Sequence, residues 1–155
     1  LSKLVMERRA ADNCYLHRDF HAALNCGIRY LAEHYGDAAV IAYLREFSQH
    51  WYAPLRRAML VEGLLPVCRH IVDVHRVEGV EVGVEELPFG TILRIPVCPA
   101  VGHIRGMGET PHRLFVETTR TVHGALCEGT PYGFELTRYD VETGGNTQRF
   151  FRRQP

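Results

Sequence analysis

The sequence lacks the short motifs by which many enzymes are identified. It contains no HExxH helix, no phosphate-binding P-loop, no GxSxG nucleophile turn and no dinucleotide-binding glycine fingerprint. No apolar run approaches the length that spans a bilayer, and residues 1–10 lack the apolar segment of a signal peptide. We therefore expect no membrane partner, and any catalytic function has to be argued from less specific patterns.

Neither charge nor cysteine content indicates a specialised class. The 18 Lys and Arg residues balance 18 Asp and Glu residues, so the chain has no excess positive charge for binding nucleic acid. The five cysteines include no CxxC pair, which argues against a disulfide framework or a structural zinc site. These features predict a cytoplasmic, reduced protein without a nucleic-acid partner.

Hydrophobic periodicity predicts a helical first half, residues 1–76. With 155 residues and 46% hydrophobic content the chain can bury one substantial core, and no repeat or linker divides it. The first helix is expected to end near Tyr35, before Gly36, and Asp37 is expected to cap the second. Three further helices are expected after Gly36, over 38–52, 54–63 and 66–74. The last two begin with Pro54 and Pro66, and proline suits the first turn of a helix.

The second half, residues 77–155, predicts a β-β-α-β-β order. Alternating valines near 80–85 are typical of a strand, and three further strands and one helix follow, while 100–108 is too irregular to assign. The strands are expected over 91–97, 132–139 and 147–152, and the helix over 111–127. The sequence therefore predicts a single α+β domain over residues 1–155, with helices segregated from a mostly antiparallel sheet.

Two histidines one turn apart lie on the apolar side of the first predicted helix. At about 100° per residue, His17 and His21 share a stripe with Cys14, Phe20, Leu24, Ile28 and Leu31. Burying imidazoles costs free energy unless a hydrogen bond, a metal or a ligand satisfies them. The pair is therefore either a site, for proton transfer or for a divalent metal such as zinc or iron, or two satisfied core histidines.

The helix expected over 111–127 has a second face of interest. Beside the stripe that should cover the sheet lies a polar and reactive one, formed by His112, Val116, Thr119, His123 and Cys127. This stripe either lines a pocket or forms a half-exposed flank. Glu117 on the same helix would orient an imidazole or act as a base, unless it is simply a solvated surface carboxylate.

Cys98 stands at a predicted strand end, before Pro99 and a glycine-containing loop. With His103 five residues later, it could be a nucleophile activated by imidazole, or a metal ligand. A small buried hydrophobic residue is the alternative.

Three runs in the second half carry a resemblance to a known family: RIPVCPAVGHIRGMG, RLFVETTRTVHGALCEGTPYGFEL and RYDVETGGNTQRFFRR. They resemble the L-2-amino-thiazoline-4-carboxylic acid hydrolase-like proteins and, more distantly, the small-molecule-binding domains named after 4-vinyl reductase. The resemblance implies a helical block followed by a ββαββ unit, with a pocket for a small organic ligand between them. Where many relatives carry cysteines, this chain has Phe115 or Val116, and Gly144, Gly145 and Asn146 near the final turn.

The favoured hypothesis is a hydrolase or ring-opening enzyme acting on C–N or C–S bonds of a small polar heterocycle or amino-acid-like substrate. Its expected catalytic residues are His17, His21, Cys98, His123 and Glu117. Its expected ligand contacts are Phe20, Leu24, His103, Val116, Thr119 and Cys127. The alternative is a sensor or carrier domain that binds a small molecule without turnover. A third hypothesis is a structural or homodimerising subunit that uses exposed aromatic residues such as Trp51 and Tyr52.

Overall fold

The computed structural model describes residues 18–154, and it begins with four helices that lead to the sheet. Each turn between α1 and α2 and between α3 and α4 contains a glycine with φ near 83°, a backbone conformation that favours glycine. Pro54 and Pro66 lie in the first turns of α3 and α4, as predicted. The helices are α1 (Arg18–Tyr35), α2 (Asp37–Trp51), α3 (Ala53–Glu62) and α4 (Leu65–Val77).

Four strands form an antiparallel sheet in the order β1-β2-β4-β3, which confirms the α+β class. Gly90 in β2 pairs with Phe151 in β4, and a Cβ added to Gly90 would lie 2.3 Å from the Phe150 carbonyl oxygen. The two strands can therefore approach fully only because this position has no side chain. The strands are β1 (Gly83–Leu87), β2 (Gly90–Ile95), β3 (Tyr132–Tyr139) and β4 (Asn146–Arg152).

The segment between β2 and β3 differs from the prediction of one helix. It contains α5 (Pro99–Gly106), the 3-10 helix η2 (Arg113–Val116) and α6 (Glu117–Cys127). The glycines of α5 obscured its periodicity, but Val101 and Ile104 are buried and hold this short helix against the core. The β-β-α-β-β prediction was therefore incomplete, and the long helix begins with a tighter turn.

Two element boundaries also correct the prediction. Gly36, not Asp37, is the residue that precedes α2, and Asp37 lies in the first helical turn without capping it. The Asp37 carboxylate instead pairs with Arg113 of η2. At the other end of the helical half, α4 continues to Val77, three residues beyond the predicted end.

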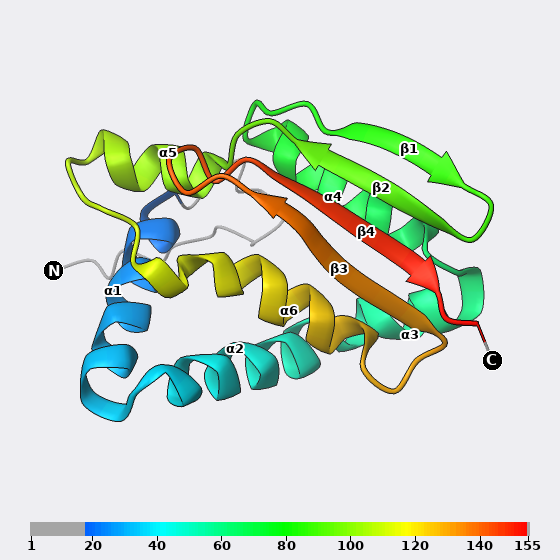
Figure 1. Cartoon of the computed structure of the whole chain (residues 1–155), viewed down its shortest axis with the longest axis horizontal. Coiled ribbons are helices and arrows are strands. Elements are labelled where there is room, and N and C mark those ends of the chain that lie inside the picture. The colour runs from blue at the N-terminus through cyan, green and yellow to red at the C-terminus, as the bar shows by residue number, and fades with distance from the viewer. Residues whose placement is uncertain (1–17, 155) are drawn as a thin grey trace, which may run out of the picture.

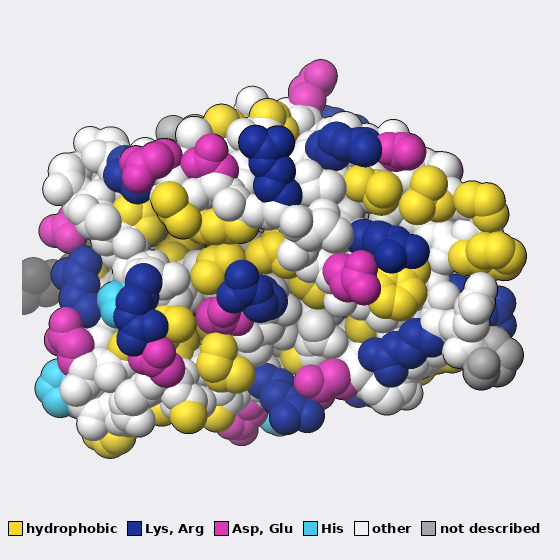
Figure 2. Space-filling model, in the orientation of Figure 1, with side chains coloured by type: hydrophobic (Ala, Val, Ile, Leu, Met, Phe, Trp, Pro, Cys, Tyr) yellow, Lys and Arg dark blue, Asp and Glu magenta, His cyan; other side chains and the backbone are white. Residues whose placement is uncertain are grey.

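The sheet has a buried face and a solvent face. Figure 1 shows α4 behind the strands, α6 beside β3 and α5 at one end of the sheet, with the front of the sheet uncovered. On the solvent face, Arg149 pairs with Glu135 and stacks over the ring of Phe151. Basic and acidic side chains are interspersed over this face, without a large patch of one sign (Figure 2).

The buried side chains form two clusters rather than one. The first packs α3, α4 and α6 against the sheet around Phe150, and the second joins α1, α2, α5 and α6 around Ile28 and Ile104. Tyr52, between α2 and α3, packs against both clusters. The space between the clusters is where the candidate site lies. None of the helices in residues 18–154 is long and apolar enough to cross a membrane.

Candidate functional site

A cavity of about 220 Å³ opens between the two clusters. Side chains of α1, α2, α4, α5, α6 and β4 line it, so residues from both halves of the chain contribute. Its walls are mainly apolar and rich in rings, which are those of Phe20, Tyr43, Phe47, Tyr52 and Phe115. Concave, largely apolar pockets with a few polar groups are typical binding sites for small organic molecules.

A chain of hydrogen bonds runs from the cavity wall into the turn before β4. The Nδ1 of His123 lies 2.8 Å from the Oε1 of Gln148, and the Nε2 of Gln148 donates to the Oδ1 of Asn146 over 2.9 Å. Asn146 in turn donates through Nδ2 to the Gly144 carbonyl over 2.9 Å. A carbonyl can only accept, so it fixes the direction of every bond in this chain.

The same chain fixes the tautomer of His123. Because Gln148 uses its Nε2–H for Asn146, its Oε1 must accept, and the Nδ1 of His123 must carry the proton. Burial lowers the pKa of His123 to about 4, although Gln148 acts in the opposite direction, so the ring is neutral at pH 7. The Nε2 of His123 is therefore an unprotonated acceptor on a ring that lines the cavity.

His21 and Glu78 form a second polar group at the cavity. The Nε2 of His21 lies 3.1 and 3.2 Å from the two Glu78 carboxylate oxygens, and the side chains are only 19% and 14% exposed. The His103 ring lies beside that of His21, with centroids 6.4 Å apart. A carboxylate that holds Nε2–H of an imidazole leaves Nδ1 available as a base or acceptor.

Helix α4 and the residue that follows it supply cavity residues that were not predicted, namely His70 and His75 on the helix and Glu78 just after it. The Nδ1 of His75 donates to the Ile71 carbonyl over 2.8 Å, and the ring of His70 packs edge-on against Tyr52. Burial lowers the pKa of His70. The helical spacing already indicated two of them, because His75 and Glu78 continue the apolar stripe of α4. The predicted helix ended at residue 74, so both fell outside it.

Cys98 lies at the cavity, in the position that precedes α5, and no imidazole within residues 18–154 pairs with its thiol. Burial raises the pKa of its thiol, and backbone groups of Ala100 and Val101 are its hydrogen-bond partners. His103, its predicted activator, instead lines a separate groove, to which Glu78 and Pro99 also contribute. A neutral buried thiol is a poor nucleophile, so the geometry does not favour the predicted Cys–His pair.

The remaining predicted residues divide into two groups. Phe20, Leu24 and Thr119 line the cavity together with His21, Cys98 and His123. Val116 and Cys127 do not, and Cys127 is buried against the first core cluster, where burial raises its pKa to about 12. His17 lies outside the described residues, as does Cys14, so the predicted His17–His21 metal pair stays a prediction.

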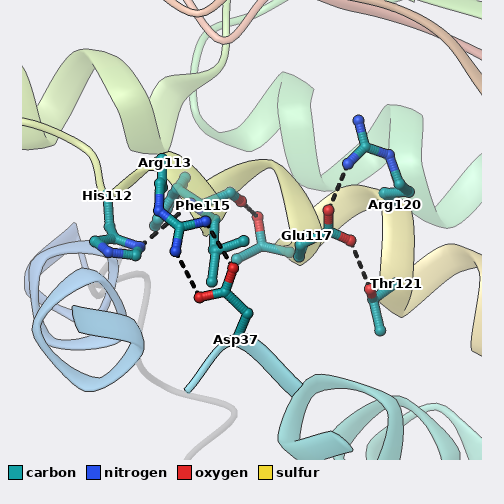
Figure 3. Close-up of polar contacts among 9 residues, drawn as sticks. Asp37, His112, Arg113, Phe115, Glu117, Arg120 and Thr121 are labelled. Carbon is teal, nitrogen blue, oxygen red and sulfur yellow. Dashed lines mark hydrogen bonds and ion pairs between the residues drawn. The ribbon is translucent and has the colours of Figure 1, made fainter. Parts of the chain in front are cut away.

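Glu117 has a structural environment rather than a catalytic one. Figure 3 shows its carboxylate accepting hydrogen bonds from Arg120 and from the Thr121 hydroxyl, the latter over 2.7 Å. It is nearly buried in the first turn of α6 and does not line the cavity. Its negative charge there stabilises the positive end of the helix dipole.

The metal hypothesis gains no support from the described part of the chain. Within residues 18–154, no three His, Cys, Asp or Glu side chains are arranged to hold a metal ion. Four of the polar groups at the cavity form two pairs, His21 with Glu78 and His123 with Gln148, rather than converging on one point.

Comparison with protein families, with curated proteins and with solved structures finds no match to this chain.

Proposed function

We propose that this protein is a small-molecule-binding domain and that its ligand occupies the cavity between the helices and the sheet. One observation carries the proposal: a ring-lined cavity of about 220 Å³ that holds a neutral histidine fixed by Gln148. An apolar wall supplies affinity and a few oriented polar groups supply specificity. The partly buried thiol of Cys98, which pairs with no imidazole of residues 18–154, supports binding over covalent catalysis.

A neutral fluorescent probe tests this proposal. The fused rings of 1-aminoanthracene suit a cavity of this size, and its emission rises when it enters an apolar environment. Leu24→Trp and Val74→Trp each place a large ring at one wall of the cavity and are expected to abolish the rise. Val77→Trp is the matched control, because Val77 also lies on α4 but is exposed and does not line the cavity. Circular dichroism confirms that each variant is folded.

Fluorescence that persists in both filling variants would place the probe elsewhere and contradict the proposal. Absence of any rise with the unmodified protein would do the same.

A second candidate is a hydrolase, and the His21–Glu78 pair favours it. In this proposal the Nδ1 of His21, which has no hydrogen-bond partner within residues 18–154, takes a proton from water as the water oxygen bonds to C2 of a thiazoline ring and the C2=N π pair moves to the ring nitrogen. That pair re-forms the C=N bond as the C2–S bond breaks, and the imidazolium returns the proton to the departing sulfur, so that C2 ends as an isourea, the tautomer of a urea. The product is a ring-opened thiol.

This reaction is tested with 2-amino-2-thiazoline and its 4-carboxylate, by following thiol release. Glu78→Gln is expected to abolish release, whereas Glu81→Gln, which removes an exposed carboxylate just beyond α4, should not. Cys98→Ala separates attack by water, which it leaves intact, from attack by the thiol, which it removes. No release from either compound would reject this candidate.

A further inference from the structure

We propose that the cavity selects small aromatic ligands whose polar groups donate hydrogen bonds, amines above all, and discriminates against carboxylates. This inference rests on the proposed binding function and specifies its ligand class. Four features of the cavity carry it: a fixed acceptor, a carboxylate, the absence of Lys and Arg among the described lining residues, and walls made of rings.

The fixed acceptor is the Nε2 of His123. The orientations of the Gln148 and Asn146 amide groups, and with them the proton on Nδ1 of His123, are fixed because the chain of hydrogen bonds ends on the Gly144 carbonyl, which can only accept. The Phe134 and Phe150 rings hold the imidazole plane, with ring centroids 5.4 and 5.8 Å from it. A ligand group that meets this nitrogen must bring its own hydrogen, as an amine, amide or hydroxyl does.

The charge at the cavity comes from Glu78. It is the one carboxylate among the described lining residues, and none of these residues is Lys or Arg. Glu78 is mostly buried and already accepts from His21, so a ligand carboxylate beside it would be an anion near an anion. A buried charge without an opposite partner is costly, whereas an ammonium group would be matched.

The aromatic side chains at the cavity also favour a cationic ligand over an anionic one. Tyr43 and Phe47 of α2 and Phe20 of α1 surround the cavity, and the faces of aromatic rings attract cations. They also stack on flat ligands. Together with Glu78, they make the cavity suited to an aromatic body with an amine at one end.

Three indole compounds of similar shape test the selectivity. Tryptamine carries an ammonium, indole-3-propionate carries a carboxylate, and indole is neutral. Each is titrated against the full chain by calorimetry and by displacement of 1-aminoanthracene. Tryptamine is expected to bind at least about tenfold more tightly than indole-3-propionate, since a charge-assisted hydrogen bond contributes on this scale.

Variants assign the preference to Glu78. Glu78→Gln keeps the shape and removes the charge, so it should weaken tryptamine about tenfold and leave indole nearly unchanged. Glu81→Gln removes an exposed carboxylate outside the cavity, so it should leave the affinities for tryptamine, indole-3-propionate and indole unchanged. Equal weakening of indole and tryptamine by Glu78→Gln would mean a structural effect and would overturn the assignment.

A measurement without mutation tests the acceptor. Nitrogen-15 spectra of the imidazole groups are expected to show His123 with its proton on Nδ1, and its Nε2 resonance should shift when tryptamine binds. A proton found on Nε2 would remove the acceptor and contradict the inference.

An incorrect ligand class and an absent binding function would give different results. If indole binds and is blocked by Leu24→Trp, but the propionate binds as tightly as tryptamine, the ligand class is wrong and the binding function stands. If none of the compounds displaces the probe and the probe itself does not bind, the proposed function fails.

Discussion

Acidification should destabilise this protein through one histidine. The pKa of His123 is lowered to about 4 by burial, whereas an unfolded histidine titrates near 6.5. Between these two values the unfolded state binds a proton that the folded state does not. The contribution of His123 to the free energy of unfolding is therefore greatest above pH 6.5. It is lost as the pH falls through this window, and it levels off below about pH 4.

The size of the effect follows from the two pKa values. Each unit of difference corresponds to about 1.4 kcal/mol, and the window between pH 7 and pH 4.5 includes most of it. We expect the free energy of unfolding to fall by about 2 kcal/mol over this range on account of His123 alone. A ligand that donates a hydrogen bond to Nε2 stabilises the neutral ring and would lower the pKa of His123 further.

The assay is urea denaturation at a series of pH values, compared between the unmodified protein and His123→Leu. His70 and His112, whose pKa values burial also lowers, are present in both proteins, so their contributions cancel in the comparison. His34→Leu, at an exposed position of α1, serves as the control and should keep the original pH profile. If the difference between the unmodified protein and His123→Leu stays constant from pH 7 to pH 4.5, the reasoning about His123 is refuted.

Three further substitutions test the packing. Asn25→Leu should lower the free energy of unfolding by about 2 kcal/mol in urea denaturation, because the buried carboxamide makes two hydrogen bonds, of 3.1 and 2.7 Å, to the backbone before η2. Gly90→Ala should cost about 2 kcal/mol or more, while Gly83→Ala, with 3.5 Å to its nearest neighbour, should be much milder; similar melting temperatures would contradict the contact argument. Glu117→Gln should lower the melting temperature and leave probe affinity unchanged, and a lost affinity would return Glu117 to the site.

Patterns that depend on one helix or strand were predicted well. The range 132–139 coincides with β3, and the apolar stripe of α6 buries Val122, Ala125 and Leu126 as expected. These features follow from periods of 2 and 3.6 residues, which each segment carries in itself. The short helix α5 was missed because its glycines weaken a pattern that tertiary contacts complete.

The candidate site forms where segments distant in the sequence come into contact, and the spacing of residues along the chain does not predict such contacts. His21 and Cys98 both line the cavity, but within residues 18–154 the partner of His21 is Glu78, which is 57 residues away, and the thiol of Cys98 meets backbone groups of Ala100 and Val101. The structure does not favour the predicted pairing of Cys98 with His103, because Cys98 lines the cavity whereas His103 lines a separate groove. His103 instead lies near His21.

The sequence by itself determined the α+β class, the antiparallel sheet and which faces of α1 and α6 turn inward, because alternation of apolar and polar residues is a local property. Only the tertiary structure decided that two core clusters leave a cavity between them, and that Gln148 and Asn146 point into the interior to fix His123. Hydrogen-bond direction and burial arise between elements that are distant along the chain. They set the protonation of the cavity, and so the chemistry that it can recognise.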